Sequence, residues 1–336
     1  MAIRHNKKGI FFTFIAVLLI MVLTTVFKPE TELSFNKDIP VIKTRVTKIN
    51  DFVTDFENVY LPNIMKLTTY RALTALTYYM DVTDVFLIDL QEDFKEVFLY
   101  GTINNNQIDD IISEDIMKNN TCINWTNRVK ESAEDALNLD LNFDITGVNI
   151  YQTTPWLIDI NLTLDYSVSS ETANWTRNNV LIKTKLSIDN LYDPLYYVIT
   201  DGNYKKKINQ TDIKFGEWNT NNLSNFIDEE EYVHWKSSNA LNFLMRFTED
   251  FSASECCGIE SAVNPVKLEL TPLNPDQEEI YLDYLFFNTA NGPYPCPRVN
   301  ELYYIDNPCM DPRFKLDWNN VVGYNVTDDA VELPCP

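Results

Sequence analysis

The sequence predicts an α+β protein with an N-terminal transmembrane helix, a helical membrane-proximal region packed on an antiparallel β-sheet, and a loop-rich C-terminal domain containing β-strands. Three observations predict this fold class. Residues 10–27 carry no charge, apolar residues then follow helical spacing to about residue 138, and from Leu139 they alternate with a period of two. The expected divisions are a basic leader (1–9), the apolar helix (10–27), the helical region (28–138), the sheet (139–200) and a cysteine-containing distal domain (201–336).

The apolar run is long enough to cross a bilayer. Eighteen helical residues span about 27 Å, close to a hydrocarbon core of about 30 Å. The run ends without a small-x-small cleavage site, so a retained anchor is favoured over a removed export signal. Arg4, Lys7 and Lys8 precede it, and this positive charge predicts a cytoplasmic N-terminus with everything from Lys28 onward outside the membrane. We expect a single span.

The junction of leader and run is more specific. Lys7, Lys8 and Gly9 lead directly into Ile10 and an apolar stretch. This pattern resembles the class III signal of archaeal type IV pilin-like, membrane-anchored surface proteins. The resemblance implies cleavage by a prepilin peptidase after Gly9, and an apolar helix that serves as both anchor and filament core.

The resemblance covers about thirty residues and has two departures. Phe14 stands where many pilins have Glu, and Pro29 interrupts the helix. An ordinary anchor therefore stays open as the alternative. The segments "NALNFLMRFTEDFSASECCGIESAVN" and "LYDPLYYV" are also similar to stretches of uncharacterised archaeal surface proteins, which implies no particular activity.

Helical spacing covers residues 41–80, and Pro62 predicts a kink or a new helix there. A second helix is expected over residues 83–100, capped by Thr83 or Asp84 and ended by Gly101. A short helix then carries Ile108, Ile111, Ile112 and Ile116, and another carries Trp125, Val129, Ala133, Ala136 and Leu137. These apolar stripes are interpreted as facing one intramolecular core, with oligomer seams as the alternative.

Three strands are expected where the period becomes two, over residues 139–145, 156–168 and 180–188. In the second, the residues expected to face water are Asp159, Asn161, Thr163, Asp165 and Ser167. A sheet that is apolar on one face must be covered on that face, and the preceding helices are its natural cover.

Turn signals at Asp193-Pro194 and Asp201-Gly202 place a boundary near residue 200. Beyond it, short helices are expected around residues 222–235 and 238–247. Strands are expected near residues 266–270, 280–287, 301–305 and 321–326. Prolines concentrate after residue 264, so this region should be rich in loops.

Six cysteines suggest an exported protein. Disulfide candidates are Cys122, Cys256, Cys257, Cys296, Cys309 and Cys335. An even number, mostly clustered in one region, favours disulfides over free thiols or a metal site, and no short C-x-x-C spacing is present. Adjacent Cys256 and Cys257 are expected to pair elsewhere rather than with each other.

Seven sequons fit an exposed glycoprotein. Their asparagines are Asn119, Asn124, Asn161, Asn174, Asn209, Asn222 and Asn325. The chain is rich in asparagine, so chance accounts for several of them.

The net charge of −22 disfavours nucleic-acid binding and is interpreted as a solubility device, with cation binding as the alternative. No catalytic signature, Walker loop or dinucleotide motif occurs, and His234 is the sole histidine after His5. No cofactor is expected. Calcium is the favoured small partner, at residues 228–231 or at Asp276, Glu278 and Glu279, although neither group matches an EF-hand.

The sequence therefore predicts a non-enzymatic, single-pass surface protein with a structural or adhesive role, whose partners are the membrane, pilin-like subunits or other surface proteins. An anchored receptor for a sugar, a peptide or a surface protein is the alternative. An extracytoplasmic hydrolase with two carboxylates in a cleft is less favoured.

Overall fold

The computed structural model describes residues 38–171, 173–214, 216–236, 238–268, 279–288, 302–306 and 313–333, with side chains from residue 43 onward. They fall into two compact units, Met1–Val53 and Thr54–Pro336. The predicted processing signal, the apolar run and Cys296, Cys309 and Cys335 lie outside the described residues. In the part of the chain that the structure describes, no helix has the length and apolarity needed to cross a membrane.

A helical run opens the described chain. Helix α2 (Asp38–Asp55) passes into a π-helical turn, η1 (Phe56–Tyr60), and then into α3 (Leu61–Thr83). Pro62 lies in the first turn of α3, directly after η1, and Tyr60 before it keeps helical backbone angles (φ −68°, ψ −54°). The irregularity predicted near Pro62 is this π-helical turn, and no fresh helix starts there.

The second helix begins later than predicted. Helix α3 continues through Thr83 and ends at Asp84, whose φ of 54° is left-handed. Helix α4 (Leu90–Tyr100) starts at Asp89, because the Asp89 carboxylate accepts hydrogen bonds from the backbone N–H groups of Gln91 and Glu92. The predicted end at Gly101 is confirmed, since Gly101 has a φ of 71°.

The next elements agree with the helical spacing in part, because the predicted short helix ends at Ile112 and Ile116 lies beyond it. A two-stranded ribbon, β1 (Thr102–Ile103) and β2 (Asn106–Gln107), precedes the short helix α5 (Ile108–Ile112). Helix α6 (Cys122–Leu137) is capped by the Thr121 hydroxyl, which accepts from the N–H of Asn124.

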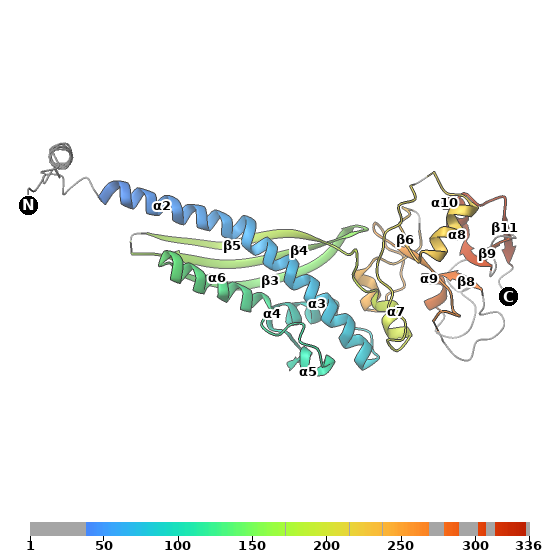
Figure 1. Cartoon of the computed structure of the whole chain (residues 1–336), viewed down its shortest axis with the longest axis horizontal. Coiled ribbons are helices and arrows are strands. Elements are labelled where there is room, and N and C mark those ends of the chain that lie inside the picture. Colours follow the sequence, from blue (N-terminus) through green and yellow to red (C-terminus); the bar gives the residue numbers. More distant parts are fainter. Residues whose placement is uncertain are drawn as a thin grey trace, which may run out of the picture. The chain divides into compact units, whose positions relative to one another are not determined.

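The three predicted strands form one antiparallel sheet of order β3-β4-β5. The first and third are longer than predicted, and the second is shifted by one residue: β3 (Asp140–Thr154), β4 (Leu157–Ser169) and β5 (Asn174–Ser187). The apolar residues of β4 are buried, and they are Ile158, Ile160, Leu162, Leu164, Tyr166 and Val168. Helix α3 contacts β5, and helices α4 and α6 contact β3, as Figure 1 also shows. The sheet therefore has the helical cover that its apolar face requires.

The opposite face of β4 is less exposed to solvent than predicted. Asn161, Thr163, Asp165 and Ser167 are half-buried. Asp159 is only 7% exposed, because it pairs with the Lys185 ammonium of β5 and accepts from the Thr153 hydroxyl. The prediction that Asp159 faces water was wrong; a cross-strand charge partner allows the carboxylate to be buried.

After residue 190 the chain builds a second sheet, of order β11-β9-β10-β8-β7-β6, in which only β10 and β8 run parallel among the described strands. Its strands are β6 (Tyr232–Val233), β7 (Glu260–Val263), β8 (Ile280–Leu282), β9 (Leu302–Ile305), β10 (Phe314–Asp317) and β11 (Ala330–Leu333). The accompanying helices are α7 (Pro194–Ile199), α8 (Thr220–Asp228), the 3₁₀ turn η2 (Leu244–Phe247), α9 (Asp283–Phe287) and α10 (Trp318–Gly323). The coarse prediction of an α+β chain is confirmed.

Several predicted elements beyond residue 200 were wrong. The helix expected over residues 238–247 is reduced to η2, and the strand expected near 321–326 is instead occupied by the end of α10. Residues 266–268 form a turn and not a strand. Helix α10 starts where it does because the Asp317 carboxylate accepts from the N–H of Asn320 and so caps it.

Candidate functional site

The most unusual group of side chains is a buried ion cluster around Arg246, here called the Arg246 cluster: Arg246, Asp193, Asp283, Tyr232 and Ser261. Arg246 Nη1 lies 2.6 Å from Asp193 Oδ2, and Arg246 Nη2 lies 2.9 Å from Asp283 Oδ2. All three charged side chains are 0% exposed. Burial this deep is costly for ions unless every charge is paired and hydrogen-bonded.

Most polar atoms of the cluster have hydrogen-bond partners, and Arg246 Nε is the guanidinium nitrogen that has none among the described residues. The Tyr232 hydroxyl donates to Asp193 Oδ2 at 2.7 Å, and the Ser261 hydroxyl donates to Asp283 Oδ2 at 3.0 Å. Arg246 Nη2 also donates to the backbone carbonyl of Ile259 at 2.6 Å. Burial acts against the charge on Arg246, but the two carboxylates hold its pKa above the ordinary value. The guanidinium is therefore permanently charged.

Local structure positions these groups. Asp193 precedes Pro194, and its other oxygen, Oδ1, caps α7 by accepting from the N–H of Leu195. Asp283 starts α9, Ser261 lies on β7, and Arg246 lies on η2. The cluster thus joins elements that are far apart in the chain, which is a structural role in itself.

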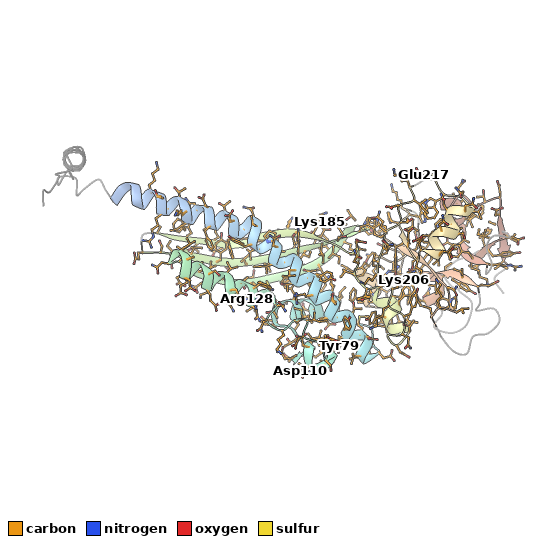
Figure 2. All side chains as sticks on the ribbon, in the orientation of Figure 1. Tyr79, Asp110, Arg128, Lys185, Lys206 and Glu217 are labelled. Carbon is orange, nitrogen blue, oxygen red and sulfur yellow. A yellow bond between two sulfur atoms is a disulfide. The ribbon has the colours of Figure 1, made fainter. Side chains whose placement is uncertain are left out.

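Lys206, which is labelled in Figure 2, is also buried, and its ammonium lies 4.9 Å from the ring centroid of Tyr232 in this cluster. Its ammonium donates to the carbonyl of Ala262 at 3.0 Å and to the Tyr196 hydroxyl at 3.4 Å, and it faces the rings of Tyr196 and Tyr232. Burial lowers the pKa of Lys206 to about 8. A lysine with this pKa exchanges its proton near neutral pH, as catalytic lysines do, but here the ammonium is enclosed.

A second buried carboxylate lies in an aromatic environment. Glu260 accepts from the Ser238 hydroxyl at 2.5 Å and from the Tyr324 hydroxyl at 2.8 Å. The Tyr324 ring packs against Trp218 and Trp235 at centroid distances of 4.8 and 5.3 Å. Burial raises the pKa of Glu260 to about 8, so this carboxyl is largely protonated at neutral pH.

None of these charged residues was predicted from the sequence. Arg246, Asp193, Asp283 and Lys206 lie in different segments, and each is ordinary in its local context. The one available signal is Asp193-Pro194, which was interpreted only as a turn. Burial of a charge depends on partners that spacing alone does not reveal.

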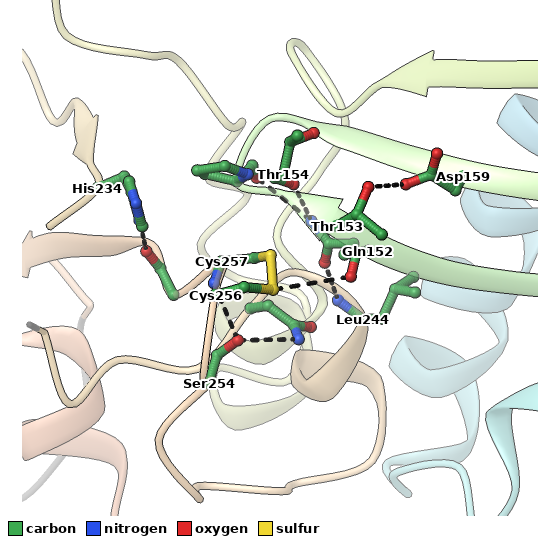
Figure 3. Close-up of a disulfide and its surroundings, with 12 residues drawn as sticks. Gln152, Thr153, Thr154, Asp159, His234, Leu244, Ser254, Cys256 and Cys257 are labelled. Atoms are coloured by element: carbon green, nitrogen blue, oxygen red, sulfur yellow. Dashed lines mark hydrogen bonds between the residues drawn. A yellow bond between two sulfur atoms is a disulfide. The ribbon is translucent and has the colours of Figure 1, made fainter. Parts of the chain in front are cut away.

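The prediction that Cys256 and Cys257 pair with other cysteines was wrong. The two sulfurs are joined to each other in a disulfide between adjacent residues (Figure 3). Cys256 is exposed and Cys257 is fully buried. Cys256 Sγ lies 3.8 Å from the carbonyl oxygen of Gln152, at the end of β3 (Figure 3). Cys122, another disulfide candidate, is a buried free thiol, and burial raises its pKa to about 12.

The sequon asparagines all reach the surface. Asn119, Asn174, Asn209 and Asn325 are exposed, and Asn124, Asn161 and Asn222 are half-buried. Two sequon threonines also have roles inside the fold. Thr121 caps α6, and the Thr126 hydroxyl donates to the carbonyl of Cys122 at 2.9 Å.

One described residue of each acidic group is engaged with other protein side chains. Glu230 lies 2.6 Å from the Lys267 ammonium and accepts from the Tyr204 hydroxyl at 2.5 Å. Glu279 pairs with Lys315, whereas Asp276 and Glu278 lie outside the described residues. Within the ranges that the structure describes, no group of three or more histidine, cysteine or acidic residues is arranged to hold a metal ion.

His234 has a simple structural partner, because its Nδ1 donates to the carbonyl of Gly258 at 2.6 Å (Figure 3).

A different aromatic group lies near the end of α3. The rings of Tyr78, Tyr192 and Tyr197 contact one another at centroid distances of 5.5–6.5 Å, and the Lys205 ammonium lies over Tyr78 and Tyr197. We call these three rings the tyrosine cluster.

Comparison with known proteins gives a short result. No protein family, curated protein or solved structure matches this chain. The geometry described above is therefore the only structural basis for a functional proposal.

Proposed function

We propose that the protein is a membrane-anchored, extracytoplasmic surface protein with a structural or adhesive role, built in the manner of a pilin-like subunit. Residues 10–27 provide the anchor, and Lys7, Lys8, Gly9 and Ile10 form the processing signal. The single observation that carries the proposal is the association of α3 with the β3-β4-β5 sheet. A helix that follows an N-terminal apolar segment and packs on an antiparallel sheet is the broad plan of pilin-like subunits.

The surface of the described chain supports this proposal. All seven sequon asparagines are accessible at least in part, as glycan attachment outside the cell requires. Among the described residues, the Arg246 cluster is held by internal ion pairs and hydrogen bonds, with Arg246 Nε as the one guanidinium nitrogen that has no partner. That arrangement suits a scaffold whose interior is fixed, and the protein is proposed to have no enzymatic activity.

The first experiment is mass spectrometry of the mature N-terminus in cells that express the full chain. A chain beginning at Ile10 supports the pilin-like route, and a Gly9→Leu variant should keep its leader. Ala2→Leu is the matched control, because it adds the same side chain away from the cleavage position and should still be processed. An intact leader in the unmodified protein would remove the pilin-like route and leave an ordinary anchor.

The second experiment separates assembly from solitary anchoring. Antibodies against the region beyond residue 200 should label surface filaments if the protein polymerises. Diffuse label along the membrane would favour a solitary adhesin. Label confined to the cytosol, with no protein in the membrane fraction, would contradict the whole proposal.

An anchored binding module is the second candidate, and the tyrosine cluster favours it. Tyr78 and Tyr192 are partly exposed, and aromatic rings beside a lysine suit the apolar faces and hydroxyl groups of a sugar. Tyr192→Ala should abolish retention on a glycan array, with Tyr60→Ala as a control on a different surface tyrosine. Equal glycan binding by both variants, or none by the unmodified protein, would count against this candidate.

A further inference from the structure

The Cys256–Cys257 disulfide contributes little to the stability of the fold. A disulfide stabilises a fold mainly by limiting the freedom of the unfolded chain, and this effect grows with the length of the loop that it closes. Adjacent residues close the shortest loop a chain can form. The bond between them therefore needs another explanation.

The surrounding loop is held by hydrogen bonds that do not involve the disulfide. The N–H of Ser254 donates to the carbonyl of Ala240 at 3.0 Å, and the N–H of Ile259 donates to the carbonyl of Leu241 at 3.0 Å. The Ser254 hydroxyl accepts from the N–H of Cys257 and from the side-chain amide of Asn242 (Figure 3). The fold around the pair can thus persist when the sulfur–sulfur bond is broken.

The two cysteine residues differ in their exposure to solvent. Cys256 is exposed, whereas Cys257 is fully buried. A thiolate attacks a disulfide in line through a mixed disulfide, and the rate depends on access to the attacked sulfur. Attack must therefore occur at Cys256, which leaves Cys257 as the departing sulfur.

From this asymmetry we infer that the Cys256–Cys257 pair is a thiol–disulfide exchange site for a dithiol reductant, at which the adjacent cysteines cycle between disulfide and dithiol while the rest of the chain stays folded. One sulfur of the reductant bonds to Cys256, and the Cys256–Cys257 bond breaks. The Cys257 sulfur takes up a proton. The second thiol of the reductant then displaces Cys256, which leaves two protein thiols and one oxidised reductant.

The position of the pair gives the exchange a structural consequence. Cys256 contacts the carbonyl of Gln152, and the Gln152 side chain links two parts of the fold (Figure 3). Gln152 Oε1 accepts from the N–H of Leu244 in η2, and Gln152 Nε2 donates to the carbonyl of Pro155 between β3 and β4. Breaking the sulfur–sulfur bond frees the Cys256 side chain to move away from Gln152, so reduction should loosen the contact between η2 and the end of β3.

The test is differential alkylation of the full-length folded protein with dithiothreitol as the probe. Before reduction, the peptide that contains both cysteines should be two hydrogens lighter than the dithiol form and joined to no other peptide. After mild reduction, the exposed Cys256 should be alkylated, the buried Cys257 and Cys122 should react only slowly, and the far-UV circular dichroism should be unchanged. A peptide that joins either cysteine to Cys296, Cys309 or Cys335 would overturn the proposal, as would reduction that requires denaturant.

Two serine variants and hydrogen exchange complete the test. In Cys257→Ser, the exposed Cys256 should be alkylated at least about tenfold faster than Cys257 is in Cys256→Ser. Equal rates would contradict the assigned direction of attack. On reduction of the unmodified protein, amide protection should fall at Leu244, whose N–H donates to Gln152 Oε1, but not at Ser254, at Ile259 or at the centre of β4. Unchanged protection at Leu244 would contradict the structural consequence, and lost protection at Ser254 and Ile259 would contradict a fold that persists without the disulfide.

Discussion

Arg246 Nη1 and Asp193 Oδ2 lie 2.6 Å apart, and both side chains are completely removed from solvent. The two residues are separated by 53 positions in the chain. Their pairing, together with Asp283, fixes α7, η2 and α9 around one charged centre. The contribution of this centre to the free energy of unfolding can be measured directly.

Arg246→Met should destabilise the protein by about 3–5 kcal/mol, because it leaves Asp193 and Asp283 as buried carboxylates without their cation. Urea denaturation monitored by tryptophan fluorescence measures the loss. Lys118→Met is the control, since Lys118 pairs with Asp115 on the surface and should cost less than about 1 kcal/mol. Similar losses in both variants would mean that the Arg246 cluster has no special structural weight.

Glu260 should make stability fall as pH rises from about 4.5 to about 8. Its pKa is 4.5 in an ordinary environment and is raised to about 8 by burial. In this window the folded protein keeps a proton that the unfolded chain releases, so the free energy of unfolding falls by up to about 1.4 kcal/mol per pH unit. Glu260→Gln should remove this part of the slope in urea titrations at graded pH. An unchanged slope in the variant would show that Glu260 is not the responsible group.

Lys206 should act in the opposite direction at higher pH. Burial lowers its pKa from 10.5 to about 8, so between these values the unfolded chain holds a proton that the folded protein has released. Stability from this group should therefore rise with pH across that window. Lys206→Met should flatten the rise, and Lys207→Met is the matched control because Lys207 is exposed. A rise that persists in Lys206→Met would disprove the assignment.

Gly101→Ala should destabilise the protein by about 1 kcal/mol or more. Gly101 ends α4 with a φ of 71°, and an added Cβ would meet Thr121 Cγ2 at 3.1 Å. Gly147→Ala is the comparison, because its Cβ would find its nearest neighbour, Thr163 Cβ, at an ordinary 3.7 Å. Thermal unfolding should show a clear decrease in Tm for the first variant and a much smaller change for the second.

Thr121 allows the cap of α6 to be separated from the sequon at Asn119. Without glycan, Thr121→Ala should cost about 1 kcal/mol through loss of the N-cap, whereas Asn119→Gln should be nearly neutral. In the glycosylated protein, both variants should lose the same glycan mass, and Thr121→Ser should keep both cap and sequon. Intact mass measurement and urea denaturation give the two readouts. If Asn119→Gln loses no mass, that sequon is unoccupied.

Local signals predicted the N-terminal half of the described fold well. An apolar stripe of period 3.6 located α6, and strict alternation located β4 within a residue or so of its bounds. These predictions were correct because capping and the burial of one face are encoded within a few neighbouring residues. The predicted start of α4 was wrong because Thr83 and Asp89 are both good N-cap residues. Helix α3 extends through Thr83, so α4 begins only after Asp89.

The C-terminal half was less predictable because its order depends on distant partners. Residues 238–247 contain apolar residues at helical spacing, yet Arg246 is held by Asp193 and Asp283, and only a short 3₁₀ turn forms. Near residue 321 the valines suggested a strand. The Asp317 carboxylate instead accepts from the N–H of Asn320 and caps α10, which begins at Trp318. The charged core could not be predicted, because sequence spacing carries no information about which distant charges meet.

Asp193 serves two structures with one side chain, since Oδ1 caps α7 and Oδ2 neutralises Arg246. The first turn of that helix and the ionic interior are consequently thermodynamically linked, and neither can be lost without weakening the other. This part of the molecule should unfold cooperatively, with no populated intermediate in which α7 has melted while the guanidinium keeps both carboxylates.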